Sequence, residues 1–447
     1  MEKTWKDMNR AERQEARFEK WLSGPGLDFV SPEAKASYHR KITRFKDAVQ
    51  LKKRPDRVPV FPFHTFMPVT LFDVLPGEVF YDGEKLVSVW MRYLEEYKPD
   101  YYISPALVMN GVPLDILDYK LYKWPGKGVD EKYPYQCVEN EYMTPDEYES
   151  FIEDPSDFFL RRYIPRICGA LEPLRSLTPL TGILELPLMG NPLIALGTPG
   201  MQKALQALMD AGKAAFEWGG HIGAFEKEAQ ELGYVNGAGG VSKAPYDVLA
   251  DTIRGTRGAM MDMYTRKDLL LEAMRRLTPI MIKEGISGPN VSGNPVVFMP
   301  LHKGADGFMS DEQFRTFYWP FLKDVILGLI EEGCVPFIFA EGGYNTRLEY
   351  LNELPKGHCV WMFDKTDMAV AKDVIGGTTC IAGNIPISTI LSGTPEQIKE
   401  LCKELIDAAG KDGGYIMTSG CSMDEAKPDT LRAMIDFTKE YGVYRQK

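Results

Sequence analysis

The fold is decided by five short apolar runs in the carboxyl-terminal part of the chain: VVFMPL (296–301), VPFIF (335–339), CVWMF (359–363), TCIA (379–382) and YIMT (415–418). Each run has the length of a buried strand, and a stretch with helical character follows each one. Some of these helices open with capping signals, such as Ser310 with Gln313 and Thr394 with Pro395. The pattern therefore predicts strands and helices that alternate.

Five strand–helix units joined by short connections predict parallel strands with right-handed crossovers. A closed barrel and an open doubly wound sheet both satisfy this pattern. We expect an α/β fold of the first kind, a TIM-type (β/α)8 barrel, whose opening strand is the apolar run at residues 58–63.

Two regions depart from this regular pattern. Residues 1–53 predict an N-terminal helical extension, made of two charged helices that Gly24-Pro25-Gly26 separates. Residues 54–447 are expected to form the barrel. Within them, the segment at about 111–150 is rich in Pro, Gly and Tyr and lacks a clear period, so we expect an insertion there.

The composition excludes several classes of protein. The net charge of −11 argues against a nucleic-acid partner, which needs a basic face. No window approaches ~18 uncharged apolar residues, so we expect no membrane span. The amino terminus is charged and lacks the apolar region of a secretory signal, and the seven cysteines show no CxxC spacing. We expect a cytoplasmic protein, with a homodimer as an open alternative to a monomer.

Polar side chains with useful chemistry follow the predicted strands. They are His64, Asn110, His302, Glu341, Asp364 with Asp367, Asn384 and Cys421. Because the carboxyl ends of barrel strands share one face, we expect these residues to converge there. The catalytic candidates are Glu341 and Asp364. The candidates for substrate binding are His64, Asn110, Tyr344 and Asn384, with Tyr344 as part of an aromatic wall.

Each candidate also has a purely structural explanation. Buried histidines bonded to backbone groups, helix-capping aspartates, a turn asparagine and core aromatic rings would account for His64, His302, Asp364, Asp367, Asn384 and Tyr344. Glu341 could simply begin a turn at Gly342-Gly343. A carboxylate directly after an apolar strand must nevertheless be paired or exposed, which favours a functional role for Glu341.

Three of these residues could bind a metal. His302, Glu341 and Cys421 offer one nitrogen, one oxygen and one sulfur donor, a set that a catalytic zinc ion can use while it keeps a position open. Their spacing is long and irregular, so the set gains meaning only from the fold. The sequence contains neither a Gly-rich phosphate loop of the Walker or dinucleotide type nor a GxSxG element.

Motifs at both ends of the chain resemble one known superfamily. The carboxyl-terminal motifs are Gly383-Asn384-Ile385-Pro386, Gly393-Thr394-Pro395-Glu396, Gly413-Gly414-Tyr415-Ile416 and the stretch from Lys427-Pro428 to Ala433-Met434. In order and spacing they resemble the end of uroporphyrinogen-decarboxylase superfamily proteins. The run Arg54-Pro55-Asp56-Arg57-Val58-Pro59-Val60 resembles the opening strand of that superfamily. The resemblance covers roughly residues 40–445 and implies a TIM-type barrel.

One branch of this superfamily consists of true decarboxylases, which the resemblance fits poorly. They hold the carboxylates of a tetrapyrrole with arginines just after the opening strand, in a segment like Arg-Gln-Ala-Gly-Arg. Here that segment, residues 61–68, reads FPFHTFMP, and no Arg occurs between Arg57 and Arg92. Because a polyanionic substrate needs cationic partners, we expect that uroporphyrinogen is not a substrate.

The other branch contains corrinoid-dependent methyltransferases, whose zinc is held by a His-x-Cys after one strand and a Cys after a later strand. The resemblance places Phe339 at the His position, Glu341 at the first Cys position and Cys421 at the distal Cys. His302 or Asp364 would complete such a site. A more oxygen-rich site suits an ether or carbonyl oxygen better than a thiol.

These points predict an enzyme that moves a methyl group from a small methylated donor, such as a methoxylated compound, to a corrinoid protein. Zinc would act as the Lewis acid, and the corrinoid would be carried by the partner protein. The alternatives are a carboxy-lyase that acts on a substrate less anionic than uroporphyrinogen, and a barrel that serves as a non-catalytic subunit.

Overall fold

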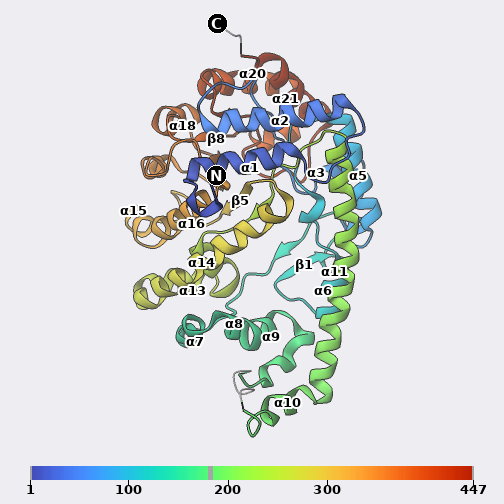
Figure 1. The fold of residues 1–447 in the computed structure, drawn as a ribbon, viewed down its shortest axis with the longest axis vertical. Coiled ribbons are helices and arrows are strands. Elements are labelled where there is room, and N and C mark those ends of the chain that lie inside the picture. The colour runs from blue at the N-terminus through green and yellow to red at the C-terminus, as the bar shows by residue number, and fades with distance from the viewer. Residues whose placement is uncertain (1–2, 180–184, 445–447) are drawn as a thin grey trace.

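The computed structural model describes residues 3–179 and 185–444 and shows an α/β fold built on a parallel sheet (Figure 1). The sheet has six strands in the order β4-β5-β6-β7-β8-β9, and every neighbouring pair is parallel. Their bounds are Gly240–Val241 (β4), Val296–Leu301 (β5), Val335–Ala340 (β6), Val360–Phe363 (β7), Cys380–Ala382 (β8) and Tyr415–Ile416 (β9). The five predicted strands are therefore confirmed to within one or two residues.

Backbone contacts link the two edges of this sheet through segments that precede β4 in sequence. Val60 forms a parallel bridge with Met417, directly after β9, and the Phe61 amide donates to the Met417 carbonyl at 2.8 Å. The Asp100 amide donates to the Val60 carbonyl at 3.2 Å, and Tyr102 forms a parallel bridge with Asn236. The predicted opening strand thus lies beside β9. It pairs through isolated bridges and does not form a continuous strand.

Helices pack around the sheet. The larger ones are α5 (Gly83–Tyr97), α11 (Pro199–Glu231), α13 (Thr256–Thr265), α14 (Lys267–Ser292), α16 (Trp319–Glu331), α18 (Met368–Ile375), α20 (Pro395–Leu405) and α21 (Pro428–Tyr441). The shorter ones are α3 (Met67–Leu71), α4 (Pro76–Val79), α12 (Pro245–Val248), α15 (Asp311–Gln313), α17 (Leu348–Leu351) and α19 (Ile387–Ser392). A further short helix, α10 (Gly190–Leu196), lies away from the sheet at the far end of α11 (Figure 1). No helix in the described ranges is long and apolar enough to cross a membrane.

The N-terminal helices pack against the amino ends of the strands. They are α1 (Arg10–Ser23) and α2 (Pro32–Gln50), and they lie side by side in Figure 1. Their buried aromatic side chains, Trp21 and Phe45 among them, form one cluster with Val296, Val335 and Val360, the first residues of β5, β6 and β7. Because these helices cover the amino ends, a site at the sheet has to form at the carboxyl ends.

The segment expected to be an insertion forms a small sheet of its own. It contains α6 (Gly111–Leu117), followed by β1 (Tyr122–Pro125), β2 (Gly128–Val129) and β3 (Gln136–Cys137) in the order β2-β1-β3. The helices α7 (Tyr148–Glu153), α8 (Pro155–Phe158) and α9 (Ile164–Ile167) come next. Tyr135 packs against Phe66 and Phe80, which follow the opening strand, so the small sheet lies near the carboxyl ends of the large one.

Candidate active site

Strand alternation decides which side chains reach the inside of the sheet. Phe337 and Phe339 of β6 belong to the inner cluster, as do alternate residues of β7 and β8. Successive residues of a strand point to opposite faces, so the residue two positions after Phe339 keeps its side. That residue is Glu341. The same count places Asp364 after β7 and Asn384 after β8 on the inner side, at the carboxyl ends.

His302 and Glu341 face each other at this end of the sheet. His302 follows β5 directly, and its Nε2 lies 3.7 Å from Oε1 of Glu341. The other ring nitrogen, Nδ1, lies 2.5 Å from Oδ2 of Asp251. Asp251 also pairs with Lys243 at 2.6 Å and with Lys303 at 3.4 Å. The imidazole is therefore held in a fixed orientation between two carboxylates.

A second aspartate fixes the backbone that carries His302. Asp247 lies in α12 and is completely buried. Its carboxylate accepts hydrogen bonds from the amides of His302 at 3.0 Å and Lys303 at 3.2 Å, and from the Tyr318 hydroxyl at 2.7 Å. Asp247 thus fixes the backbone of the loop after β5.

The charges of this cluster shift its pKa values in opposite directions. Burial raises the pKa of Asp247, and the neighbouring Asp251 adds to that effect. Burial alone would also raise the pKa of Asp251, but the bond from His302 and the charge of Lys243 outweigh it and lower that pKa. Burial would lower the pKa of His302, yet its bond to Asp251 raises it above the ordinary value. The result is an ionised Asp251 beside a readily protonated imidazole.

Glu341 differs from Asp251 in the direction of its pKa shift. Burial raises the pKa of Glu341, the charges of Asp251 and Asp364 raise it further, and His302 offsets only part of this. A carboxyl group with a raised pKa is a better proton donor near neutral pH. The pair His302–Glu341 therefore places an imidazole beside a candidate acid.

Four of the predicted residues line one pocket next to this pair. Asp364, Asp367, Asn384 and Cys421 lie in the wall of a cavity of about 860 Å³, together with apolar residues of α18, α19 and α20. Asp367 also caps α18, where its side chain accepts a hydrogen bond from the Ala369 amide at 2.9 Å. Oδ2 of Asp364 accepts a hydrogen bond from the amide of Gly342, the neighbour of Glu341, at 3.1 Å. The side-chain amide of Asn384 donates to the backbone carbonyl of Asp364 at 3.0 Å. Asn384 therefore holds the loop after β7 in place and also lines the pocket.

The surroundings of this pocket are acidic. Burial raises the pKa of Cys421, and the charges of Glu341, Asp364 and Asp424 raise it further. The thiol accordingly stays protonated. The cations near Glu341 are Lys243 and His302, and both face Asp251. The pocket lining itself contains one lysine, Lys365, against three carboxylates, those of Asp364, Asp367 and Glu404. This arrangement favours a neutral or cationic substrate over a polyanion.

The three remaining predicted substrate contacts do not line the pocket. His64 is completely buried against Trp90 and Tyr93 of α5, because it follows Phe63, an inner residue, and so points to the opposite side. Asn110 caps α6, where its side chain accepts from the Val112 amide at 2.9 Å. Tyr344 is also completely buried, and burial and the charges of Asp247 and Glu341 raise the pKa of its hydroxyl. His64 and Asn110 thus support the fold away from the site, whereas Tyr344 packs behind it.

Sequence reasoning missed both aspartates that position His302. Asp247 and Asp251 are four residues apart, at a break where α12 gives way to a π-helical turn, Leu249–Ile253. The i,i+4 spacing puts both carboxylates on one helical face, and the short strand β4 ends just before them. That spacing was the available signal, and π-helical turns often accompany functional sites.

The donor set for a metal is incomplete as placed. His302 has a free Nε2, an outer carboxylate in Asp251 and Glu341 nearby, which is the arrangement typical of a ligating histidine. Among residues 3–179 and 185–444, however, no three His, Cys, Asp or Glu side chains are grouped closely enough to hold an ion. Zinc would require Cys421 to approach the pair.

Comparison with known proteins gives one family. The model of the family described as uroporphyrinogen decarboxylase (URO-D) matches residues 204–441. A uroporphyrinogen decarboxylase of Flavobacterium johnsoniae is 24% identical over 333 residues, which are 65% of this chain and 90% of that protein. Another, from Aromatoleum aromaticum, is 27% identical over 184 residues, 40% of this chain and 50% of that protein.

The fold has a relative among solved structures. The structure of a methyltransferase from Methanosarcina mazei matches 89% of this chain and 98% of its own length, with a TM-score of 0.56 and 16% identity. At that identity the likeness shows a shared fold. The family model covers more than half of the chain, including β4 to β9 and the loops after them. The chain therefore belongs to the uroporphyrinogen decarboxylase (URO-D) family.

Proposed function

We propose that this chain is an enzyme that transfers a methyl group from a small methylated donor, such as a methoxylated aromatic compound, to a corrinoid carried by a partner protein. The observation that carries the proposal is the pairing of His302 with Glu341, whose pKa is raised, beside the pocket that Asp364 and Cys421 line. The methyltransferase from Methanosarcina mazei, which shares the fold, adds support.

We propose further that the sheet closes into a (β/α)8 barrel. The bridges Val60–Met417 and Tyr102–Asn236 support closure, as does the hydrogen bond from the Gly239 amide to the Val296 carbonyl at 2.8 Å. A closed barrel brings the loops after all strands to one face. In this proposal residues 1–53 are a helical extension, and 54–447 form the barrel with its insertion at about 111–150.

The reaction breaks the bond between oxygen and the methyl carbon. The reduced corrinoid supplies the electron pair that accepts the methyl group, and one proton has to reach the leaving oxygen. In this proposal Glu341 delivers that proton, because its raised pKa makes the carboxyl group a better proton donor near neutral pH than an ordinary glutamate. His302, held by Asp251, orients Glu341 and balances its charge once the proton has left. The products are an alcohol or phenol and the methylated corrinoid.

Zinc enters the proposal as a Lewis acid that would polarise the donor oxygen when bound. His302 and Glu341, with Asp251 behind the imidazole, support such binding, whereas Cys421 is not gathered with them as placed. The proton transfer described above uses side chains of this chain alone and does not depend on zinc. Asp364 accepts a hydrogen bond from the amide of Gly342, the residue after Glu341. It is the second candidate for proton transfer.

Zinc content can be measured directly. If His302, Glu341 and Cys421 bind zinc, elemental analysis of protein loaded with zinc and desalted gives about one zinc per chain. Glu341→Gln then lowers occupancy more than the ~10–100-fold typical of outer-sphere changes. Glu349→Gln, an exposed substitution in α17, serves as the control. If Glu341→Gln binds as much zinc as wild type, Glu341 is not a zinc ligand. If wild type binds no zinc, the metal drops out of the proposal, but Glu341 can still act as the proton donor.

The second candidate function is decarboxylation, which the names of the two curated relatives favour. The acidic surroundings of Cys421 argue against the eightfold carboxylated substrate of that reaction. We expect no coproporphyrinogen when the purified protein is incubated with uroporphyrinogen and the products are separated by chromatography. Detectable coproporphyrinogen would restore the decarboxylase function.

The experiment that tests methyl transfer uses 2-methoxyphenol as the probe. Incubation with reduced cobalamin should yield catechol, which chromatography quantifies. The reaction should need both the protein and the reduced cobalamin. Catechol formation without cobalamin, or none across a panel of methoxylated phenols, would contradict the proposal.

A further inference from the structure

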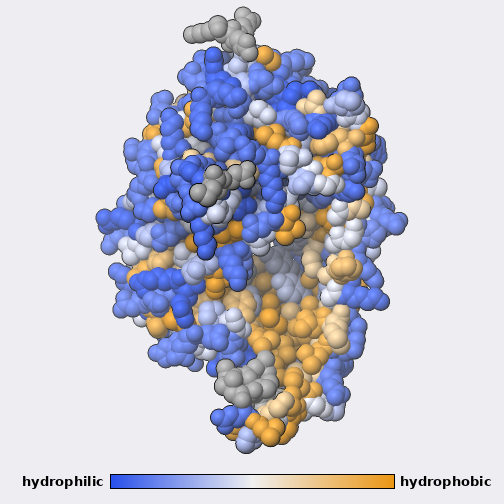
Figure 2. Space-filling model, in the orientation of Figure 1, coloured by the Kyte–Doolittle hydropathy of each residue, from blue (hydrophilic) through white to orange (hydrophobic). Residues whose placement is uncertain are grey.

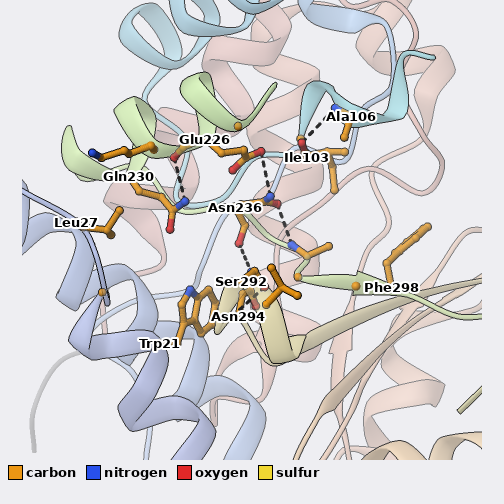
Figure 3. Close-up of a pocket in the computed structure, with 18 of the residues that line it drawn as sticks. Trp21, Leu27, Ile103, Ala106, Glu226, Gln230, Asn236, Ser292, Asn294 and Phe298 are labelled. Carbon is orange, nitrogen blue, oxygen red and sulfur yellow. Dashed lines mark hydrogen bonds between the residues drawn. The ribbon is translucent and has the colours of Figure 1, made fainter. Parts of the chain in front are cut away.

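A second cavity lies apart from the candidate active site. Its volume is about 710 Å³, and its walls come from α11, the loop between α1 and α2, and the segment around β4. Figure 3 shows its lining, and Figure 2 shows the surface hollowed beside α11, with hydrophobic residues along the lower side. It shares no lining residue with the pocket at Asp364 and Cys421.

The walls of this cavity are mainly apolar and aromatic. Trp21 and Leu27 line one side, and Ile103 and Phe298 line the other (Figure 3). The ring of Phe298 packs against Phe63 at 5.2 Å between centroids, which closes the cavity toward the inner cluster of the sheet. A volume of this size with such walls is typical of a small-molecule site.

One acidic side chain enters this apolar wall. The carboxyl group of Glu226, in α11, accepts a hydrogen bond from the Tyr102 hydroxyl at 2.8 Å. It accepts a second one from the side-chain amide of Asn236 at 3.2 Å. Asn236 is fixed in turn, because its side-chain oxygen accepts from the Ala238 amide at 3.0 Å, and Asn294 donates to its carbonyl at 2.8 Å. Figure 3 shows the bonds that join Asn236 to Glu226 and Asn294 along the cavity wall. The carboxyl group of Glu226 is therefore held in place.

Glu226 has no cationic partner in the part of the chain that the structure describes. Lys227, which also lines the cavity, pairs with Glu231 at 3.6 Å instead. Burial raises the pKa of Glu226, and its bonds from Ser104, Tyr102 and Asn236 offset part of the rise. A partly buried carboxylate without a counter-charge is unfavourable in an apolar wall, and a bound cation would supply the missing charge.

We propose that this cavity is a second binding site, which takes a small apolar molecule with one cationic amine. The ammonium group binds Glu226, and the apolar body packs against Trp21, Ile103 and Phe298. An anionic ligand would meet the Glu226 carboxylate, whereas the faces of the aromatic rings attract a cation. The site is independent of methyl transfer, because it lies outside the pocket at Asp364 and Cys421.

The test compares two probes of equal shape, 2-phenylethylamine and 2-phenylethanol, in titration calorimetry with the full-length protein. The amine should bind one site per chain, at least about tenfold more tightly than the alcohol. Glu226→Gln should abolish this preference and leave the thermal midpoint near that of wild type. Glu228→Gln, an exposed substitution on the same helix, should retain the preference.

A second variant locates the site. Ala106 lines the cavity and is exposed, so Ala106→Trp fills the space without changing Glu226. This variant should lose binding of both probes. Equal affinity of the two probes for wild type, no saturable binding of the amine, or undiminished binding to Ala106→Trp would each overturn the proposal. Demethylation of 2-methoxyphenol should be unaffected by Glu226→Gln.

Discussion

Replacing Glu341 with Gln is expected to lower the turnover number for demethylation by about 10²- to 10⁴-fold, the range typical of a lost proton donor. Gln keeps the size of the side chain and removes the acidic proton. The fold should tolerate the change, because Glu341 is half-exposed at the end of β6 and, among residues 3–179 and 185–444, has only His302 as an ion-pair partner, at 3.7 Å. Steady-state kinetics with 2-methoxyphenol and reduced cobalamin measure the loss.

The pH dependence separates this role from a structural one. A proton donor is active in its protonated form, so the rate should be present below the raised pKa of Glu341 and fall as the pH rises through it. Glu341→Gln should show no such alkaline limb in its residual rate. Glu349→Gln should keep both the rate and the limb. A limb that persists unchanged in Glu341→Gln would show that another group donates the proton.

Replacing Asp247 with Ala is expected to destabilise the protein strongly. The change leaves two partly buried amides, of His302 and Lys303, and the buried Tyr318 hydroxyl without their acceptor. Each unpaired buried donor costs ~1–3 kcal/mol, so the total loss should be at least about 3 kcal/mol. Denaturant unfolding followed by circular dichroism measures it.

The control for Asp247→Ala is Asp373→Ala, an exposed substitution on α18. Surface changes of that kind usually stay within about 0.5 kcal/mol. Asp247→Asn should lie between the two, because the amide keeps one acceptor oxygen. A loss for Asp247→Ala as small as the control would mean that the loop after β5 does not depend on Asp247.

The carboxyl-terminal strands could be predicted because each is a short apolar run with a helix after it. β5 to β9 were found from that signal, and the residue after each strand end followed from it. Glu341 was predictable for a further reason: an ionisable group placed directly after a fully buried strand has to meet a partner or solvent. The structure gives it His302 as that partner.

The other residues of the site could not be predicted from the position of a strand end alone. His64 was assigned to the site because it follows the opening strand, but it directly follows Phe63, an inner residue, so alternation turns it toward α5. Asp247 and Asp251 come from a helical segment, where no strand end marks them. Their contacts with His302 join residues more than fifty positions apart, and only the folded chain shows them.

The most direct test of methyl transfer follows the methyl group itself. The purified protein is given 2-methoxyphenol with a labelled methyl carbon and reduced cobalamin, and the label is traced after one turnover. The account predicts that the label leaves with the cobalamin fraction, with one catechol formed for each labelled methyl group transferred. Label that remains on the aromatic compound, or that is released as carbon dioxide, would contradict it.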